Sequence, residues 1–221
     1  MGAPGATTRV LVPVKAFHHA KQRLAPVLPP ASRAQLARLM AEAVLRAAVP
    51  HAPAVVCDDQ TVADWAHALG AEVVWRPGRG LNGAVEDGVA HLVTSGAERV
   101  VVAHADLPLA LPPASPAAAA TTAGEAGGSF AQVCAFDGIT LVPDRHDDGT
   151  NVLCLPAEAA AGFSFAYGPG SCARHRVQAE RTGLAVRVLA DRRLGWDVDR
   201  PDDLEQPEVQ ALVHLAAEGA A

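Results

Sequence analysis

The sequence predicts an α/β domain with a mostly parallel central sheet and helices on both of its faces. The first observation is a set of four short Val-rich runs, each bounded by Pro, Gly or Asp, as is typical of strands buried on both faces. The second is that segments of helical periodicity lie between these runs, an alternation that indicates parallel pairing. The predicted strands are Arg9–Val14, Ala54–Cys57, Glu72–Trp75 and Arg99–Ala103.

Three helices are expected between these strands. Ser32–Ala48 carries apolar residues at helical spacing, and Ser32 is expected to cap its amino end. Thr61–Leu69 is followed by Gly70, a usual helix stop. Asn82–Val93 is the third predicted helix.

The second half of the chain is less regular. Strands are predicted at Ile139–Pro143, Asn151–Leu155 and Ala185–Leu189, and helices at Ser171–Arg181 and from Asp202 onward. The Ala- and Pro-rich stretch Ala110–Gly128 (110–128) is interpreted as a tolerant surface segment. Because the sequence contains no repeat and no linker, we expect a single domain over residues 1–221 with its core at about 9–206.

The composition limits the classes of protein to which the chain can belong. A net charge of −6 argues against broad electrostatic binding to nucleic acid or to an anionic membrane. Four cysteines without a CxxC pair are interpreted as reduced thiols: Cys57, Cys134, Cys154 and Cys172. Met1–Ala6 lacks the pattern of a secretory signal, and no apolar segment is long enough to span a bilayer. We therefore expect a soluble cytoplasmic protein.

Three aspartates form the strongest candidate site. Asp106 follows the strand Arg99–Ala103, where open α/β sheets hold their ligands. Asp197 and Asp199 are two residues apart, so in an extended backbone both side chains point to one face. Three converging oxygen donors would suit Mg²⁺ and a phosphorylated substrate. The alternative is ordinary surface turn chemistry, which the apolar surroundings of these residues disfavour.

A basic loop follows the first predicted strand. It carries Lys15, Lys21 and Arg23 in an otherwise acidic protein. Cations beyond the first strand of an α/β sheet are well placed to neutralise the phosphates of a nucleotide. The loop has neither Walker nor GxGxxG spacing, and the alternative is a solvated basic loop.

Small-polar turns precede two of the predicted helices. Gly80–Gly83 permits a close backbone approach to a ligand, and Asn82 either caps the helix or contacts a base edge. The turn Tyr167–Ser171 leads into another helix, whose first amides and Ser171 would hold a phosphate or carboxylate. The alternative for Ser171 is a simple helix cap.

Several motifs, in order, resemble the 2-phospho-L-lactate or phosphoenolpyruvate guanylyltransferases of coenzyme F-420 biosynthesis. They are Val12–Lys15 with Ala20–Leu24, Gly80–Ala84, Ala105–Leu109, Pro143–His146 with Gly149–Asn151, Phe163–Phe165 with Tyr167–Gly168, and Asp197–Asp199. The resemblance extends from Arg9 to Leu204. Gln22 departs from it, because the family usually has Ser at that position.

The resemblance implies a Rossmann-like, three-layer α/β/α domain similar to nucleotide-diphospho-sugar transferases. It implies that GTP and a small phosphorylated three-carbon acid react to give a guanylylated product and pyrophosphate. Lys15, Lys21 and Arg23 would then face the triphosphate, with Asn82 in the guanine–ribose region. Asp106, Asp197 and Asp199 would hold Mg²⁺, and the acid would be bound by Thr150, Gly168 and Ser171. The family permits a homodimer, although no hydrophobic stripe in the sequence demands one.

Two other functions remain as alternatives at this stage. One is a nucleotidylyltransferase with a different acceptor, such as a sugar phosphate or molybdopterin, or with CTP as donor. The missing Gly-Gly-rich signature in the amino-terminal loop argues against it. The other is a non-catalytic nucleotide-binding protein, against which the three aspartates and the basic loop argue. The Ala-, Arg- and Pro-rich composition suggests a high-GC bacterial source. In such bacteria the family that the chain resembles is associated with phosphoenolpyruvate, which favours that acid by association.

Overall fold

The computed structural model describes residues 7–111, 130–160 and 162–220. The segment predicted at 110–128 falls outside these ranges except for its first two residues. Seven strands form one sheet in the order β3-β2-β1-β4-β6-β5-β7. Their bounds are β1 Thr8–Pro13, β2 Ala54–Cys57, β3 Glu72–Trp75, β4 Arg99–Ala103, β5 Ile139–Pro143, β6 Thr150–Pro156 and β7 Val186–Val188. The predicted strands are therefore confirmed, with ends that differ by one residue at most.

The sheet is mostly parallel, as predicted. Alone among the described strands, β6 is antiparallel to its neighbours, β4 and β5. A parallel return from β5 would need a crossover of about a dozen residues or more, whereas only the turn 144–149 separates β5 from β6. The start of β6 thus lies at the edge of the sheet where the other strands end.

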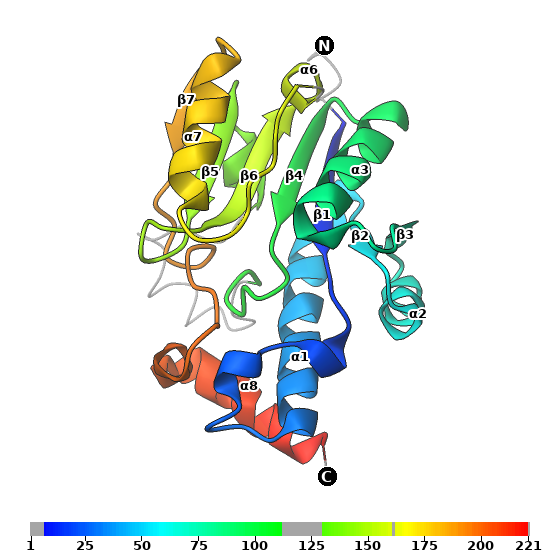
Figure 1. Cartoon of the computed structure of the whole chain (residues 1–221), viewed down its shortest axis with the longest axis vertical. Coiled ribbons are helices and arrows are strands. Elements are labelled where there is room, and N and C mark those ends of the chain that lie inside the picture. The colour runs from blue at the N-terminus through cyan, green and yellow to red at the C-terminus, as the bar shows by residue number, and fades with distance from the viewer. Residues whose placement is uncertain (1–6, 112–129, 161, 221) are drawn as a thin grey trace.

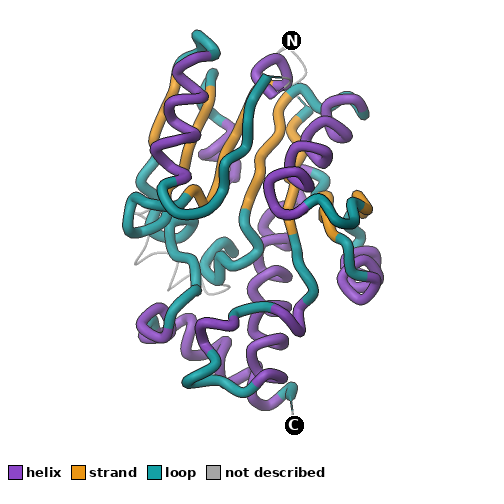
Figure 2. The backbone as a smooth tube through the Cα atoms, in the orientation of Figure 1, coloured by secondary structure: helices purple, strands orange, loops and turns teal. Residues whose placement is uncertain are grey.

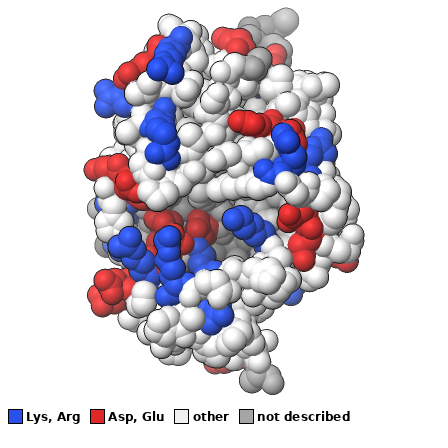
Figure 3. Space-filling model, in the orientation of Figure 1, with Lys and Arg blue, Asp and Glu red and all other residues white. Residues whose placement is uncertain are grey.

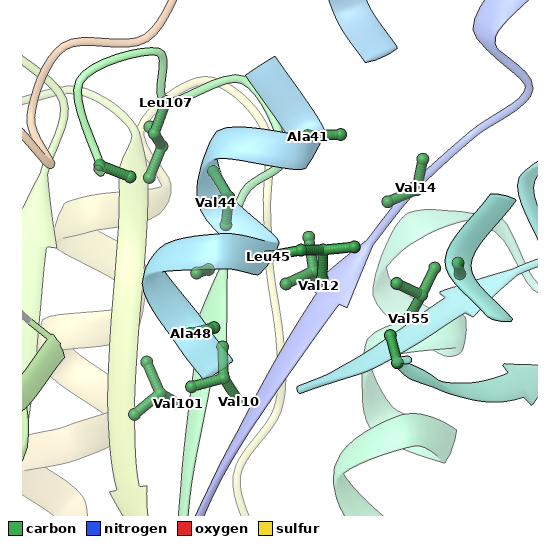
Figure 4. Close-up of a cluster of buried hydrophobic side chains, with 14 of the residues drawn as sticks. Val10, Val12, Val14, Ala41, Val44, Leu45, Ala48, Val55, Val101 and Leu107 are labelled. Carbon is green, nitrogen blue, oxygen red and sulfur yellow. The ribbon is translucent and has the colours of Figure 1, made fainter. Parts of the chain in front are cut away.

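Helices cover both faces of the sheet (Figure 1). Buried residues of α1 (Pro30–Ala48), α2 (Gln60–Ala68) and α5 (Phe130–Cys134) share one core cluster with Val10 and Val12 of β1. Those of α3 (Gly80–Thr94), α6 (Ala157–Ala160) and α7 (Ser171–Arg181) share the opposite cluster with Leu11. Successive side chains of β1 thus point to opposite faces of the sheet, and the helices on both faces give the three-layer architecture. Figure 4 shows the Val side chains of β1 facing the apolar side chains of α1.

The amino end of α1 and the carboxyl end of the chain form a smaller body beyond the sheet. The 3₁₀ turns η1 (Phe17–His19) and η2 (Gln22–Leu24) follow β1, and η4 (Pro201–Glu205) precedes α8 (Pro207–Glu218). A third cluster packs Leu24, Met40 and Val198 against α8. In Figure 2 the connecting loops gather between this body and the sheet. Another 3₁₀ turn, η3 (Val49–His51), follows α1.

Two local predictions need correction. The first long helix begins at Pro30, with Pro29 as its cap residue, and Ser32 is buried in the first turn. Proline at the first helical position is favoured because its fixed φ suits the helix and its missing N–H is not needed there. The last helix does not run unbroken from Asp202, because η4 ends before Pro207 begins α8.

The described part of the chain has no helix both long and apolar enough to cross a membrane. All four cysteines are free; three are buried and Cys134 is half-buried. The four free thiols agree with the reduced cysteines expected from the sequence.

Gly195 allows the segment 195–199 to pass beside the end of β5. A Cβ atom at this position would lie 2.6 Å from the carbonyl oxygen of Asp191 and 3.3 Å from that of Pro143. Both atoms belong to the backbone, so a side chain there requires the segment to move.

We therefore predict that Gly195→Ala lowers the free energy of unfolding by about 1–3 kcal/mol, the usual range for overpacking. Gly162→Ala is the matched control, since a Cβ there would meet no described atom within 4 Å. Chemical denaturation of both variants checks the prediction, and equal midpoints would contradict it.

Candidate active site

The candidate site lies at the edge of the sheet where most strands end. Lys15 follows β1, Asp106 follows β4 and Asp144 follows β5, while the antiparallel β6 begins at Thr150. Four strands therefore contribute side chains from one edge, as expected for an open α/β sheet. Figure 3 shows acidic side chains in a hollow across this part of the molecule, with Lys and Arg beside them.

Backbone hydrogen bonds fasten the segment that carries Asp197 and Asp199. The N–H of Val198 donates to the carbonyl oxygen of Asp106 at 3.2 Å. The carboxylate of Asp203 accepts from the N–H groups of Asp199 and Arg200, both at 2.6 Å. Residues far apart in sequence are thereby held at one place, so all three predicted aspartates face the same cavity.

Lys21 joins two of these aspartates. Its Nζ lies 2.7 Å from Asp106 Oδ2 and 3.1 Å from Asp199 Oδ1, and its side chain is only 9% exposed. Burial by itself lowers the pKa of this amine, but the two carboxylates outweigh burial and the net pKa is raised. Arg23 Nη1 adds a contact of 3.3 Å to Asp199 Oδ2, although the side chain of Arg23 is 68% exposed.

The three carboxylates experience different electrostatic environments. Burial raises the pKa of Asp106, but Lys21 and His104 outweigh it and the net pKa falls below its ordinary value. For Asp197, burial and the charges of Asp106 and Asp199 act together and raise the pKa to about 7. Asp106 Oδ1 is buried without a hydrogen-bond partner among the described residues. The site therefore holds more carboxylate charge than its cations offset.

The aspartates do not form a ready-made metal cluster. Across residues 7–111, 130–160 and 162–220, no group of three or more His, Cys, Asp or Glu side chains is arranged to hold a metal ion. Lys21 instead provides the positive charge between Asp106 and Asp199. The three predicted ligands thus face one cavity, and two of them, Asp106 and Asp199, meet at the ammonium of Lys21.

Two cavities meet at this ion-paired cluster. The first cavity, of about 470 Å³, lies between the aspartates, the turn 144–151 and the turn 168–171. The second cavity, of about 560 Å³, lies between the loop 13–23, Leu81 and residues 104–106. The residues that line both are Arg23, His104, Asp106, Gly168 and Asp199. A group bound in either cavity would reach the same carboxylates.

Thr150, Gly168 and Ser171 all line the first cavity. The two turns that carry them are linked, because Gly170 N–H donates to Asp148 Oδ1 at 3.0 Å. Ser171 Oγ accepts from Thr150 N–H, also at 3.0 Å. Ser171 does not cap α7, since Gly170 occupies the cap position, so the simple capping alternative is wrong.

The turn 144–149 is shaped by Asp144. Its carboxylate accepts hydrogen bonds from the backbone N–H groups of His146, Asp148 and Gly149 at 2.8 to 2.9 Å. These bonds engage both carboxylate oxygens of Asp144 inside its own turn. Asp144 thus fixes the wall of the first cavity.

Lys15 and Asn82 occupy different positions relative to the second cavity. Lys15 is exposed and lines it, whereas Leu81, the neighbour of Asn82, lines it in place of Asn82 itself. Asn82 Oδ1 accepts from the backbone N–H of Tyr167 at 2.8 Å, so Asn82 braces the loop that leads to Gly168. The helix α3 begins two residues before Asn82, so the capping interpretation is wrong.

Sequence reasoning missed two residues that line the first cavity. His104 lines both cavities and packs against Tyr167 with ring centres 4.8 Å apart and ring planes tilted by 46°. Its Nε2 is buried without a partner among the described residues. Its position directly after β4, at the sheet edge that carries the site, is a signal that could have identified it. Arg145 pairs with Asp203 at 2.5 Å and lies over the ring of Trp196, and no local pattern predicts that arrangement.

The raised pKa of Asp197 generates a prediction for stability. Its pKa is about 7 in the folded protein against an ordinary value of 3.8, so between these pH values the folded state keeps a proton that the unfolded state has released. The contribution of Asp197 to the free energy of unfolding therefore falls as pH rises from about 4 to 7. Asp197→Asn should remove that slope and be more stable than the parent at pH 8.

Thermal unfolding at pH 5 and pH 8 in the presence of a chelator checks this prediction. The Tm of Asp197→Asn should rise by about 2–4 °C for each kcal/mol gained in the free energy of unfolding. The chelator keeps divalent cations from masking the effect. Parallel pH profiles for the two proteins would refute the electrostatic description.

The chain is similar to known nucleotidyltransferases over most of its length. A family model described as "Guanylyl transferase CofC like" matches residues 8–115. A phosphoenolpyruvate guanylyltransferase of Rubrobacter xylanophilus is 39% identical, covering 92% of this chain and 94% of that protein. A 2-phospho-L-lactate guanylyltransferase of Methanothermobacter thermautotrophicus is 30% identical, covering 89% and 82%.

Solved structures share the fold at low sequence identity. A putative nucleotide-diphospho-sugar transferase from Desulfovibrio desulfuricans superposes with a TM-score of 0.66 at 16% identity, covering 97% of each chain. A nucleotidyl transferase from Methanothermobacter thermautotrophicus has a TM-score of 0.59 at 14% identity, covering 96% of this chain and all of that one. The fold and the sequence matches agree, and the chain belongs to the CofC-like guanylyl transferase family.

Proposed function

We propose that this protein transfers GMP from GTP to phosphoenolpyruvate or 2-phospho-L-lactate and releases pyrophosphate, a step of coenzyme F-420 biosynthesis. The observation that carries the proposal is the meeting of two cavities at the ion-paired cluster of Lys21, Asp106 and Asp199. Transfer of a nucleotidyl group needs two anionic substrates side by side, and this arrangement offers each of them a cavity with shared charged residues.

The second cavity would take GTP. Lys15, Lys21 and Arg23 line it and would contact the triphosphate, where they offset charge on the departing pyrophosphate. Asn82 would act on the guanine–ribose region indirectly, because its side chain accepts a hydrogen bond from Tyr167 and so holds that loop beside this cavity.

The first cavity would take the acid. Thr150 and Ser171 offer hydroxyl groups, and Gly168 permits a close backbone approach with a φ of +121°. A carboxylate and a phosphate are both suited to such short neutral donors. Among the relatives, those at 36% to 39% identity are named for phosphoenolpyruvate and the one at 30% for 2-phospho-L-lactate, which favours phosphoenolpyruvate as the acceptor.

Mg²⁺ fits the chemistry of the acidic residues. Asp106 has a buried oxygen without a partner among the described residues, and the raised pKa of Asp197 signals uncompensated carboxylate charge. Asp106, Asp197 and Asp199 would hold the ion, with the ammonium of Lys21 giving up at least one of its present contacts. When bound, the ion would supply charge neutralisation between the phosphate groups of the two substrates.

The reaction then requires little proton transfer. An oxygen of the acid's phosphate forms a bond to the α-phosphorus of GTP, and the bond from that phosphorus to the oxygen of the β-phosphate breaks, with its electrons leaving on pyrophosphate. The attacking phosphate is already ionised at neutral pH, so a general base is not needed. The residues named above act by bringing the two anions together and by stabilising the pyrophosphate.

The four free thiols support a cytoplasmic location.

Pyrophosphate release from GTP and Mg²⁺, with phosphoenolpyruvate and 2-phospho-L-lactate in parallel reactions, tests the proposal. An inorganic pyrophosphatase pulls the equilibrium toward product. Release that depends on one of the acids is the expected outcome and identifies the acceptor. Release with neither acid, while GTP still binds, would overturn the proposal in favour of another acceptor or of a non-catalytic nucleotide-binding protein.

Lys15→Ala should weaken the use of GTP. Loss of one charge-assisted contact to phosphate costs about 1.5–3 kcal/mol, or roughly 10- to 150-fold in kcat/KM for GTP. Steady-state kinetics with saturating acid measure it. Arg38→Ala is the matched control, since Arg38 is an exposed cation on α1 that lines neither described cavity. Equal kinetics for Lys15→Ala and the parent would contradict the role given to Lys15.

A further inference from the structure

His175 is a buried histidine beneath the first cavity. It lies on α7, its relative exposure is 0%, and both ring nitrogens are engaged. Nε2 lies 2.9 Å from the backbone nitrogen of Ala166, and Nδ1 lies 3.0 Å from Thr150 Oγ1. One histidine thus connects the loop before Gly168 to a hydroxyl of the cavity wall.

These two contacts determine which ring nitrogen carries the hydrogen. The Ala166 N–H can only donate, so Nε2 must accept and carries no hydrogen. A neutral imidazole has one N–H, which then lies on Nδ1 and donates to Thr150 Oγ1. Burial, together with the charge of Arg174 and of His104, lowers the pKa of His175 to about 4, so the ring is neutral at physiological pH.

Aromatic neighbours keep the ring in place. Tyr167 packs against it at 4.7 Å and 75° between ring planes, and Phe163 and Phe165 lie at 5.8 and 6.4 Å. Contacts of this kind restrict rotation of the imidazole. The direction of its Nδ1–H is therefore set by packing as well as by hydrogen bonding.

The consequence for the cavity concerns the hydroxyl hydrogens. Thr150 Oγ1 accepts from His175, and Ser171 Oγ accepts from Thr150 N–H. Because each oxygen accepts a bond from within the fold, each hydroxyl has its own hydrogen left to donate. Thr150 cannot donate back to Nδ1, which already carries a hydrogen. Two hydroxyls of the first cavity are thereby prepared as donors, which suits a negatively charged oxygen.

We propose that His175 is a positioning residue of the reaction: its Nδ1–H orients the Thr150 hydroxyl so that Thr150 donates to an anionic oxygen of the phosphorylated acid. This inference rests on the proposed function, in which the acid occupies the first cavity. His175 itself does not line that cavity, so it acts through Thr150 and not by direct contact.

The tautomer can be observed without any substrate. With ¹⁵N-labelled histidine, the ring signals of His175 are identified by their absence from the spectrum of His175→Phe. The expected result is the neutral form protonated at Nδ1. Protonation at Nε2, or a doubly protonated ring at neutral pH, would overturn the proposal whatever the enzyme's activity. This arm is therefore independent of the proposed function.

A double-mutant cycle tests the route through Thr150. His175→Phe should raise KM for the acid about three- to tenfold, the range for one neutral hydrogen bond, and leave KM for GTP unchanged. In a Thr150→Val background the same substitution should have no further effect on KM for the acid. Additive effects would show that His175 does not act through this hydroxyl and would overturn the proposal.

Two further variants separate positioning from folding. His175→Asn keeps an amide group at the place of Nδ1 and should recover part of the acid affinity. Thr140→Val removes another fully buried hydroxyl, from β5, which lies outside both described cavities, and should leave KM for the acid unchanged. An equal loss in Thr140→Val and Thr150→Val would assign the effect to general destabilisation and count against the proposal. Failure of the proposed function would instead appear as absent turnover in the unaltered protein.

Discussion

The arrangement of the site depends on one interaction, the contact of a nearly buried ammonium with two carboxylates. Asp106 lies near the middle of the chain and Asp199 near its carboxyl end. Their charges would repel each other at a poorly hydrated edge of the sheet. Lys21 offsets that repulsion and does so from a left-handed backbone conformation with a φ of 53°. The loop after β1 therefore turns back toward the sheet at Lys21, which lines the second cavity.

The same interaction explains why the carboxyl-terminal part of the chain belongs to the site. Val198 is buried against Leu24 and Met40, and its N–H donates a hydrogen bond to the carbonyl oxygen of Asp106 in the loop after β4. The body formed by α1 and α8 thus holds the aspartate pair against the sheet. A cation arriving with substrate would meet carboxylates that are already close together, with a lysine that can exchange one anionic partner for another.

Sequence reasoning described the sheet well because its strands are short, Val-rich and buried. Ala54–Cys57 and Arg99–Ala103 have the predicted bounds for that reason. The same reasoning placed Asp106 correctly from the rule for strand ends. It missed the reversal of β6, although the short turn 144–149 excludes a parallel crossover. It also misjudged Ser32, because the helix begins two residues earlier at Pro30, and Asn82, whose partner Tyr167 is a tertiary contact. It overlooked His175, whose two hydrogen bonds join segments that no local pattern relates.

The structure separates Lys15, which is exposed, from Lys21, which is buried in its ion pairs. They are also the only two lysines in the whole sequence. An amine-reactive acylating reagent therefore finds just two side chains to modify, apart from the amino terminus. Lys15 is open to the reagent, whereas Lys21 must first leave its carboxylates and lose a proton. Once the amino terminus and Lys15 have reacted, the third mass increment on the intact protein reports how often the site opens. Mass spectrometry can follow it without any engineered label.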